Sequence, residues 1–302
     1  MPELPEVQTV VNDLNKTIKG KTILDVLYCD NKKMFKGITF DKFKKEIKNR
    51  KIVDIKRRAK YIVLELSGEK VLIFHLKMTG HILIISNSQF PIPNFGTPSA
   101  FIKKGGWIGK NLSKELQDPK NQFVHLILEL SGGKIFAFSD VRKFGIARLE
   151  NRDYLSHMDS KLGLDALDPK FDLNQFEKIL EGSGGKIKQI LMDQGKISGI
   201  GNIYGDEILF VAGVRPDRLA RKLKKGEIKK IYASIRPILE KAVKHRGSSE
   251  SDFRDANGKK GDYQNHSYVY RREKVGCRNC GSEIKKIRVG QRSAHYCTKC
   301  QK

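Results

Sequence analysis

Near its C-terminus the chain carries Cys277-Arg-Asn-Cys280-Gly-Ser-Glu-Ile-Lys-Lys-Ile-Arg-Val-Gly-Gln-Arg-Ser-Ala-His-Tyr-Cys297-Thr-Lys-Cys300. Each Cys-x2-Cys pair can place two thiolates on one tight knuckle, and two knuckles complete the tetrahedron that zinc prefers. Because all four positions are Cys, no coordination position stays open. The pattern therefore predicts one structural Zn²⁺ held by Cys277, Cys280, Cys297 and Cys300. Two disulfides, or chance spacing, are the alternatives.

The charge of the chain is its next informative feature. It has 302 residues, with 59 Lys and Arg against 34 Asp and Glu, for a net charge of +25. Such an excess attracts polyanions, with nucleic acid first among them, although general surface charging is the simpler alternative. The basic residues gather in three separate regions, 42–60, 218–230 and 271–302. This separation predicts a binding surface assembled from distant parts of the chain.

Hydrophobic patterning predicts a multidomain α+β fold. Apolar residues spaced as in an amphipathic helix run from Val7 to Ile18 and end at Gly20. Strand-like runs follow at 22–29, 61–66, 71–75, 124–130 and 135–138, with Ser-Gly turns inside two hairpins. We therefore expect an N-terminal β-sandwich or flattened barrel with one leading helix over residues 1–150. Cys29, inside an apolar run, is expected to be a small core residue.

The rest of the chain divides by composition. Residues 86–120 are rich in Pro and Gly and are expected to form a loop inserted between strands. From 151 onward the apolar period becomes helical, near 176–180, 187–191, 203–209 and 228–238, and the polar segment 246–265 is expected to be a mobile loop. These shifts predict a helical domain over 151–265 and a zinc finger over 266–302.

No membrane association is expected. No run approaches the roughly 18 apolar residues of a membrane span, and the N-terminus lacks the basic and apolar regions of a secretory signal. We expect an intracellular, cytoplasmic protein.

The N-terminal residues can support covalent chemistry. Removal of the initiator Met would leave Pro2 with a free secondary amine, which titrates near pH 8, about two units below Lys. Attack of such an amine on an aldehydic carbon gives a cationic iminium, which is a strong electron sink. Glu3 and Glu6 place carboxylates close by in sequence as proton shuttles or electrostatic stabilisers. On these grounds alone, an N-terminal Pro without any catalytic role is the simpler interpretation.

Three further stretches have both a functional and a structural interpretation. The basic run ending at Lys60 can hold phosphate, supply a general acid or base, or be a solvated charge run. The glycine-rich stretch 197–207 is typical of two helices joined by a tight turn. The N–H groups of that turn and the Asn202 side chain can bind phosphate, or the turn can be an ordinary capped turn. Arg292, near the tip of the predicted finger hairpin, suits bidentate phosphate contact but can also be simply exposed.

Six motifs recur together in one known family. They are Pro2-Glu3-Leu4-Pro5-Glu6-Val7, Arg57-Arg58-Ala59-Lys60-Tyr61, His75-Leu-Lys-Met78-Thr-Gly80, Asp140-Val-Arg142-Lys-Phe144-Gly145, Gly201-Asn202-Ile-Tyr204 and Gln291-Arg292 before the four-cysteine finger. In this order they closely resemble bacterial formamidopyrimidine-DNA glycosylases over the whole chain. The resemblance implies a β-sandwich, a helix–two-turn–helix domain and a zinc finger.

The resemblance also implies an activity and roles for individual residues. It implies a base excision repair enzyme that excises oxidised purines such as 8-oxoguanine and formamidopyrimidines, then cleaves the abasic site by β,δ-elimination. Pro2 would form the Schiff base, Glu3 would donate the proton for ring opening and base release, and Glu6 would support them. Lys60 would be the proton donor in β-elimination, and Arg292 would hold the flanking phosphates during δ-elimination.

The same resemblance predicts the DNA contacts and the partner. Duplex DNA with oxidised bases or abasic sites is the expected partner of a monomer that associates with the bacterial nucleoid. Extrusion of the damaged nucleotide exposes its sugar. The side chains expected to fill the resulting hole or touch DNA are Met78, Arg142, Phe144, Lys188, Asn202, Tyr204 and His125. A family histidine before the strand at 124 is absent from Asn121-Gln-Phe123-Val, and is either missing or shifted to His125. About 247–254 is the expected base-recognition loop.

Two other functions remain open from the sequence. One is the related endonuclease VIII type, which prefers oxidised pyrimidines, although Leu4 favours the purine enzyme because that relative usually has Gly there. The other is a non-catalytic zinc-finger protein that binds nucleic acid, which charge and zinc alone would suit equally well. The presence of Pro2, Glu3 and Lys60 argues against this last class.

Overall fold

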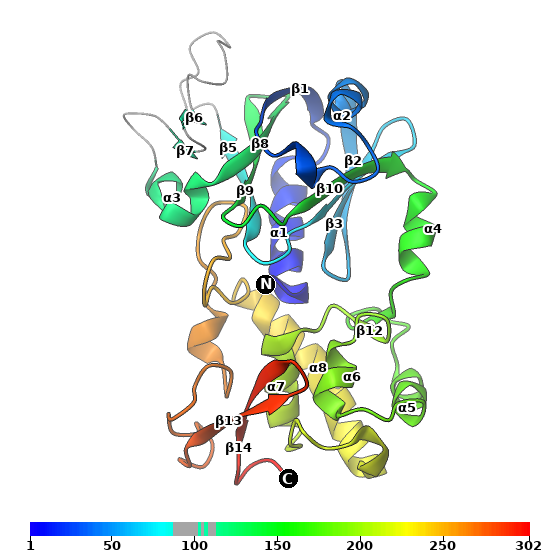
Figure 1. Ribbon diagram of the computed structural model, residues 1–302, viewed down its shortest axis with the longest axis vertical. Coiled ribbons are helices and arrows are strands. Elements are labelled where there is room, and N and C mark those ends of the chain that lie inside the picture. The colour runs from blue at the N-terminus through cyan, green and yellow to red at the C-terminus, as the bar shows by residue number, and fades with distance from the viewer. Residues whose placement is uncertain (87–101, 104–105, 108–112) are drawn as a thin grey trace. The chain divides into compact units, whose positions relative to one another are not determined.

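The computed structural model describes residues 1–86, 102–103, 106–107 and 113–302 (Figure 1). The chain forms two compact units, each assembled from segments that are distant in sequence. Unit 1 comprises residues 1–2, 6–155 and 246–262, and unit 2 comprises residues 3–5, 156–245 and 263–302. Among the described helices, none has both the length and the apolar character needed to cross a membrane.

Unit 1 is built on an antiparallel sheet of eight strands in the order β10-β4-β3-β2-β1-β8-β9-β5. Its strands are β1 (Thr22–Cys29), β2 (Arg50–Arg58), β3 (Tyr61–Leu66), β4 (Lys70–His75), β5 (Gly80–Ser86), β8 (Val124–Leu130), β9 (Lys134–Asp140) and β10 (Ile146–Asn151). Only two residue pairs join β1 to β2, whereas neighbouring hairpins pair along most of their length. The sheet thus divides into two halves of four strands each.

The two halves enclose one core, as a sandwich does. Phe74 of β4 packs against Phe136 and Phe138 of β9, with ring centroids 5.2 and 5.7 Å apart. The helices α1 (Leu4–Thr17) and α2 (Phe40–Ile47) add their apolar faces to this core. The predicted leading helix, both predicted hairpins and the β-sandwich are confirmed. Continuous apolar runs bounded by Ser-Gly turns specified these hairpins, and nearly every residue of β3, β4, β8 and β9 is buried because both faces of these strands are covered.

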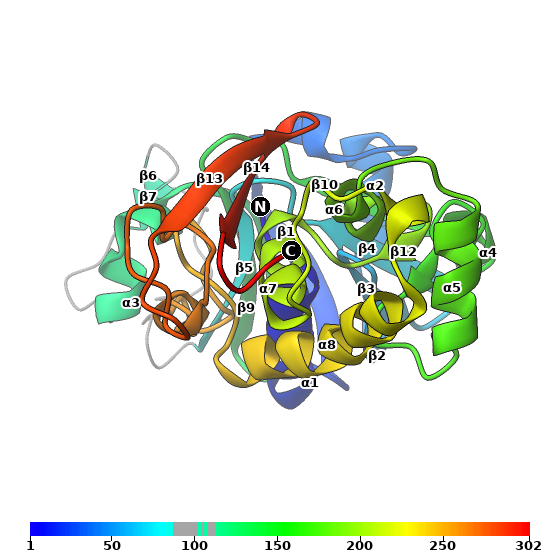
Figure 2. The same cartoon turned by 90° about the horizontal axis from the view of Figure 1, so that it is seen from below.

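Unit 2 contains the helical part of the chain and the finger. Its elements are α4 (Tyr154–Asp159, shared with unit 1), β11 (Leu164–Asp165), α5 (Leu173–Glu181), α6 (Ile187–Met192), β12 (Ile197–Ser198), α7 (Asn202–Val211), α8 (Lys225–Lys244), β13 (Ile284–Val289) and β14 (Arg292–Cys297). The four helices expected from apolar spacing are present as α5 to α8. In Figure 2 the β13–β14 hairpin lies beside α7, which is the most deeply buried helix of the unit.

Two segments expected to be loops carry more structure than their composition indicated. Within 86–120, the described residues include the short strands β6 (Ile102–Lys103) and β7 (Gly106–Trp107), then α3 (Lys114–Gln117) and the start of a 3₁₀ turn at Pro119–Gln122. The segment expected to be mobile, 246–265, has little regular structure but buries Phe253 and Ala256 in the core of unit 1. A polar composition concealed these few apolar anchors.

A buried histidine in β5 makes the stability of unit 1 sensitive to acid. Burial lowers the pKa of His81 from 6.5 to about 4. As pH falls below about 6.5, His81 takes up a proton in the unfolded state before it does so in the folded state. The contribution of neutral His81 to the unfolding free energy is therefore fully present above about pH 6.5 and is lost as the pH falls toward 4. We expect wild-type protein to lose up to about 3 kcal/mol more unfolding free energy than His81→Gln between pH 7 and 4.

Denaturant unfolding at a series of pH values measures this difference. The exposed His157→Gln is the matched control and should follow the wild-type pH profile. Parallel profiles for wild type and His81→Gln would contradict the assignment.

Candidate active site and DNA-binding residues

The carboxylate of Glu3 caps the N-terminus of α7. Its Oε1 accepts a hydrogen bond from the Ile203 amide at 2.9 Å, and its Oε2 accepts one from the Tyr204 amide at 3.3 Å. The first amides of a helix have no partner within the helix, and the helix dipole favours negative charge there. Glu3 is 2 % exposed. The start of the chain is therefore fixed on this helix by a charge-assisted contact.

The turn before α7 is shaped to admit Glu3. A Cβ on Gly201 would lie 2.3 Å from the Glu3 carboxyl carbon, so no larger residue fits without displacing that side chain. The Leu4 amide also donates to the Gly199 carbonyl at 3.1 Å. The expectation that the first amides of this helix bind phosphate is thus corrected. Two of these amides already bind a carboxylate of the protein itself.

A buried ion pair joins α6 to α7, and both of its members also bind the backbone of the finger hairpin. The Lys188 Nζ lies 2.6 Å from the Asp206 Oδ1 and donates to the Ser293 carbonyl, also at 2.6 Å. The His295 amide donates to the other oxygen of Asp206 at 2.9 Å. Burial lowers the pKa of Lys188, and the Asp206 carboxylate opposes that shift. Ser293 follows Arg292, so this network fixes the strand from which the exposed Arg292 projects.

A second buried acid, Glu207, organises the chain that leads into the finger. Its two carboxylate oxygens accept four hydrogen bonds from the segment 263–270. Three come from the backbone amides of Tyr268, Val269 and Tyr270 at 2.7–2.9 Å, and one comes from the Tyr263 hydroxyl at 3.1 Å. Burial raises the pKa of Glu207, and these bonds oppose the shift. Sequence reasoning missed Asp206 and Glu207. The available signal was an adjacent pair of acids within an otherwise apolar helix.

The four cysteines form a compact cluster that fits a tetrahedral metal. The Cys277 and Cys300 Sγ atoms are 3.9 Å apart, and those of Cys280 and Cys297 are 3.4 Å apart. Tetrahedral Zn–S bonds of about 2.3 Å place sulfurs roughly 3.8 Å apart. The Asn279 amide donates to the Cys277 Sγ, as expected for a knuckle around a thiolate ligand. These residues fit one structural zinc.

The catalytic candidates of unit 1 are buried or partly buried. Pro2 is buried, and Lys60 is 5 % exposed at the turn between β2 and β3. The adjacent Ala59 has a φ of +53°, and the Arg57 guanidinium stabilises the turn by donating to the Ala59 carbonyl at 3.0 Å. Glu6 accepts a hydrogen bond from the Ser248 amide at 2.7 Å. Of the other catalytic candidates, Glu3 and Arg292 belong to unit 2.

An exposed aromatic loop of unit 1 has the form expected of a wedge. Phe144 is 52 % exposed, and the Arg142 guanidinium stacks over its ring at 4.6 Å. The Asp140 carboxylate holds the loop by accepting from the Gly145 amide at 2.7 Å and the Arg142 amide at 3.2 Å. Met78 is also exposed, at 36 %. These exposed apolar side chains are therefore available for contact with a partner.

Three residues expected to contact DNA are instead buried. His125 is 4 % exposed, with its ring nitrogens 2.7 Å from an Asp30 carboxylate oxygen and 2.9 Å from the Asp140 carbonyl. Tyr204 is fully buried within α7, and Lys188 is 1 % exposed in its ion pair. The structure gives these side chains supporting positions, because their polar atoms already have protein partners or lie in the core. Asn202, by contrast, is partly exposed.

Family models match the chain in three consecutive regions. The Formamidopyrimidine-DNA glycosylase N-terminal domain matches residues 1–147, the H2TH domain of the same enzymes matches 162–254, and the zinc finger found in FPG and IleRS matches 277–302. Together with the sandwich, the capped helix α7 and the four-cysteine cluster, these matches define a zinc-finger DNA glycosylase.

Individual relatives identify the family. The chain is 33% identical to a formamidopyrimidine-DNA glycosylase of Herpetosiphon aurantiacus and 35% identical to one of Pelotomaculum thermopropionicum, covering 99–100% of each chain. It matches Lactococcus lactis Fpg in complex with DNA containing an abasic site, with a TM-score of 0.82 and 32% identity over 99% of both chains. The same Lactococcus protein has also been solved with DNA containing N7-benzyl-Fapy-dG, with a TM-score of 0.82 over all of both chains. The chain belongs to the formamidopyrimidine-DNA glycosylase family.

The fit between Gly201 and Glu3 can be tested by adding one methyl group. Gly201→Ala should displace the Glu3 carboxylate from α7 and reduce base excision by roughly a hundredfold, the scale expected when a reacting group is misplaced. Single-turnover excision from an 8-oxoguanine duplex measures the effect. Gly184→Ala is the matched control, since a Cβ there meets nothing within 4 Å. Wild-type rates in Gly201→Ala would contradict the close fit between Gly201 and Glu3.

Zinc removal should unfold the finger locally and weaken DNA binding, because a closed four-cysteine site contributes folding free energy. Cys297→Ser should lose the bound zinc and bind duplex DNA less tightly, as measured by elemental analysis and fluorescence anisotropy. Cys29→Ser should keep one zinc per chain and normal affinity, since burial raises the pKa of Cys29 to about 11 and it lies outside the cluster. Unchanged binding by zinc-free protein would refute the role of the finger.

Proposed function

We propose that this chain excises oxidised purines from duplex DNA and then cleaves the abasic site, using the Pro2 amine as nucleophile. The observation that carries the proposal is the fixed position of Glu3, directly after Pro2 in sequence, on the N-terminus of α7. A carboxylate held in this way next to an amine can move protons without having to be ordered first. Family membership supplies the reaction class.

The proposed reaction begins after removal of the initiator Met. The neutral Pro2 nitrogen attacks C1′ of the extruded nucleotide as the bond from C1′ to the base breaks. Glu3 gives a proton to the departing base and takes up the proton that the Pro2 nitrogen loses. The ring oxygen O4′ then departs from C1′, takes that proton from Glu3, and leaves a cationic iminium between Pro2 and C1′. Loss of a C2′ proton expels the 3′-phosphate oxygen, and loss of the C4′ proton in a second elimination expels the 5′-phosphate oxygen. Addition of water to the iminium carbon and release of the Pro2 amine free the enzyme.

The other site residues have proposed supporting roles. Lys60 is assigned proton transfer in the first elimination, because it is a buried ammonium at a fixed turn. Arg292 is assigned the phosphates beside the lesion, because an exposed guanidinium can hold them in a bidentate manner. Glu6 is assigned a supporting role through its contact with the Ser248 amide.

For the duplex, we assign Met78, Arg142 and Phe144 to the space left by the extruded nucleotide. Their exposure and the rigid loop around Asp140 support this assignment. Insertion of apolar groups between base steps costs a few kcal/mol, which contacts to the bent duplex offset. Asn202 is the remaining proposed phosphate contact, whereas Lys188, Tyr204 and His125 are assigned to support of the surfaces that touch DNA.

We further assign residues 1–150 to the catalytic sandwich, 151–265 to the helix–two-turn–helix domain and 266–302 to the finger. The protein is expected to act as a monomer on the nucleoid in the bacterial cytoplasm, where its DNA substrate is located. Preference for oxidised purines over pyrimidines is supported by the names of the relatives and by Leu4, which packs in the core of unit 2.

Borohydride reduction should trap a covalent complex between wild-type protein and a duplex that contains 8-oxoguanine, because hydride reduces the iminium to a stable amine. Pro2→Gly should abolish trapping, since the secondary amine is lost, while the exposed Pro169→Gly should trap normally. Denaturing electrophoresis measures the adduct. N-terminal mass spectrometry of the same samples checks that Met1 is absent.

A side-by-side assay on thymine-glycol duplexes measures the lesion preference. Faster trapping on 8-oxoguanine supports the purine assignment, and the reverse order would favour the endonuclease VIII type. The absence of any adduct with a panel of oxidised bases, or retention of Met1, would overturn the proposed chemistry.

A further inference from the structure

The segment 246–262 of unit 1 is anchored along its length despite its polar, glycine-rich sequence. At its start, the Arg246 guanidinium lies 2.5 Å from both the Asp13 and the Asp255 carboxylates. Two residues later, the Ser248 amide donates to Glu6. The Asp13 and Glu6 side chains both come from α1. The first part of the segment is therefore tied to the helix that follows Pro2 and Glu3 in sequence.

The middle of the segment is bound by a different part of unit 1, residues 118–120. Arg254 is 3 % exposed, and its Nε and Nη2 donate to the two carboxylate oxygens of Asp118 at 2.9 and 3.1 Å. The Lys120 ammonium lies 2.6 Å from the Asp252 carboxylate. Asp118 and Lys120 belong to the short stretch that follows α3. A bidentate Arg–carboxylate pair fixes orientation as well as distance, which a single Lys contact cannot do.

Backbone contacts complete the anchorage. The Asn121 side chain donates to the Gly258 carbonyl at 3.1 Å, and the Ile84 amide donates to the Ala256 carbonyl at 2.8 Å. Gly258 has a φ of +78°, and a Cβ there would lie 2.7 Å from the Asn121 amide nitrogen. Asn121 is itself bound to the buried His81 ring at 2.8 Å. The far half of the segment thus rests on the edge strand β5 and on residues 118–121.

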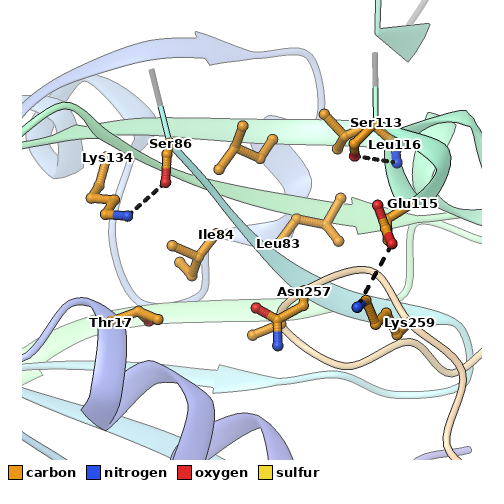
Figure 3. Close-up of a pocket in the computed structure, with 12 residues that line it drawn as sticks. Thr17, Leu83, Ile84, Ser86, Ser113, Glu115, Leu116, Lys134, Asn257 and Lys259 are labelled. Carbon is orange, nitrogen blue, oxygen red and sulfur yellow. Dashed lines mark hydrogen bonds and ion pairs between the residues drawn. The ribbon is translucent and has the colours of Figure 1, made fainter. Parts of the chain in front are cut away.

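Figure 3 shows the pocket beside this segment. Asn257 and Lys259 of the segment line this cavity of about 380 Å³ together with Glu115 of α3, and the Lys259 Nζ lies 3.8 Å from the Glu115 carboxylate. The exposed Lys259 pair contributes little, as surface ion pairs usually do. In this part of the segment the anchorage therefore comes from the buried Arg254 and from Asn121 rather than from Lys259.

We propose that Arg254 is a positioning residue for base recognition: its clamp on Asp118 holds residues 248–253 in place, with the Ser248 amide on Glu6, before DNA binds. The inference rests on the proposed function, and on the expectation from the family resemblance that about 247–254 recognises the base. A segment ordered in advance does not lose conformational freedom when the damaged base arrives. Without the contact between Arg254 and Asp118, the segment would have to become ordered each time the protein binds a damaged base. Steps that involve the base should then slow, whereas steps on a sugar that has lost its base should not.

The test compares two substrates with the same full-length protein. Arg254→Met, which keeps the length of the side chain but removes the clamp, should slow single-turnover base excision from an 8-oxoguanine duplex by roughly tenfold to a hundredfold. Cleavage of an abasic-site duplex should stay within about twofold of wild type. Asp118→Asn should show the same split, and Arg254→Lys should recover part of the excision rate. Hydrogen exchange at the amides of 248–256 should quicken in the variants that lose excision.

Arg152→Met is the matched control, because it removes only an exposed ion pair with Glu65 and should leave both rates unchanged. Equal slowing on both substrates would show that Arg254 has a merely structural role and would overturn the proposal. Unchanged excision by Arg254→Met would also overturn it. A wild-type protein inert on both substrates would instead overturn the proposed function.

Discussion

The contact on which the rest of the site depends is the binding of the Glu3 carboxylate to the first amides of α7. The free amides of a helix N-terminus and the dipole behind them supply a local positive potential. The chain satisfies that potential with an acid one residue after the proposed nucleophile. Because Gly201 leaves just enough room for that acid, the conformation of the turn and that of the chain start are coupled. The same contact also explains why two of these amides are not free to bind phosphate.

The helix α7 itself depends on buried charges rather than on apolar packing alone. Asp206 and Glu207 are both fully buried, and each binds a different part of the finger and its leading segment. Buried acids are unfavourable unless their oxygens are all engaged, so each restricts its partners to one arrangement. The partner segments include the strand that begins at Arg292. The ion pair between Lys188 of α6 and Asp206 of α7 therefore helps to determine where the exposed Arg292 of the finger lies within unit 2.

Several predictions from the sequence were correct because their signals are local. Cysteine spacing, apolar runs joined by Ser-Gly turns and helical periodicity each specify an element from residues that are neighbours in the chain. Predictions of exposure were less successful. His125 and Lys188 were expected to face DNA, but ring and ammonium groups look the same in sequence whether they face solvent or pair inside the fold. The polar segment 246–265 was expected to be mobile for the same reason, because its partners lie more than a hundred residues away.

The sequence by itself determined the family, the zinc ligands and the secondary structure of the sandwich and helices, and it supplied the candidates for the reacting side chains. These follow from residue type and short-range spacing, which the chain carries in any conformation. Only the tertiary structure decided which polar groups have partners. It placed Glu3 on α7, joined Lys188 to Asp206, and clamped Arg254 with Asp118. Such pairings arise from packing between segments distant in sequence, where burial makes every unpaired donor or acceptor costly and so selects one arrangement.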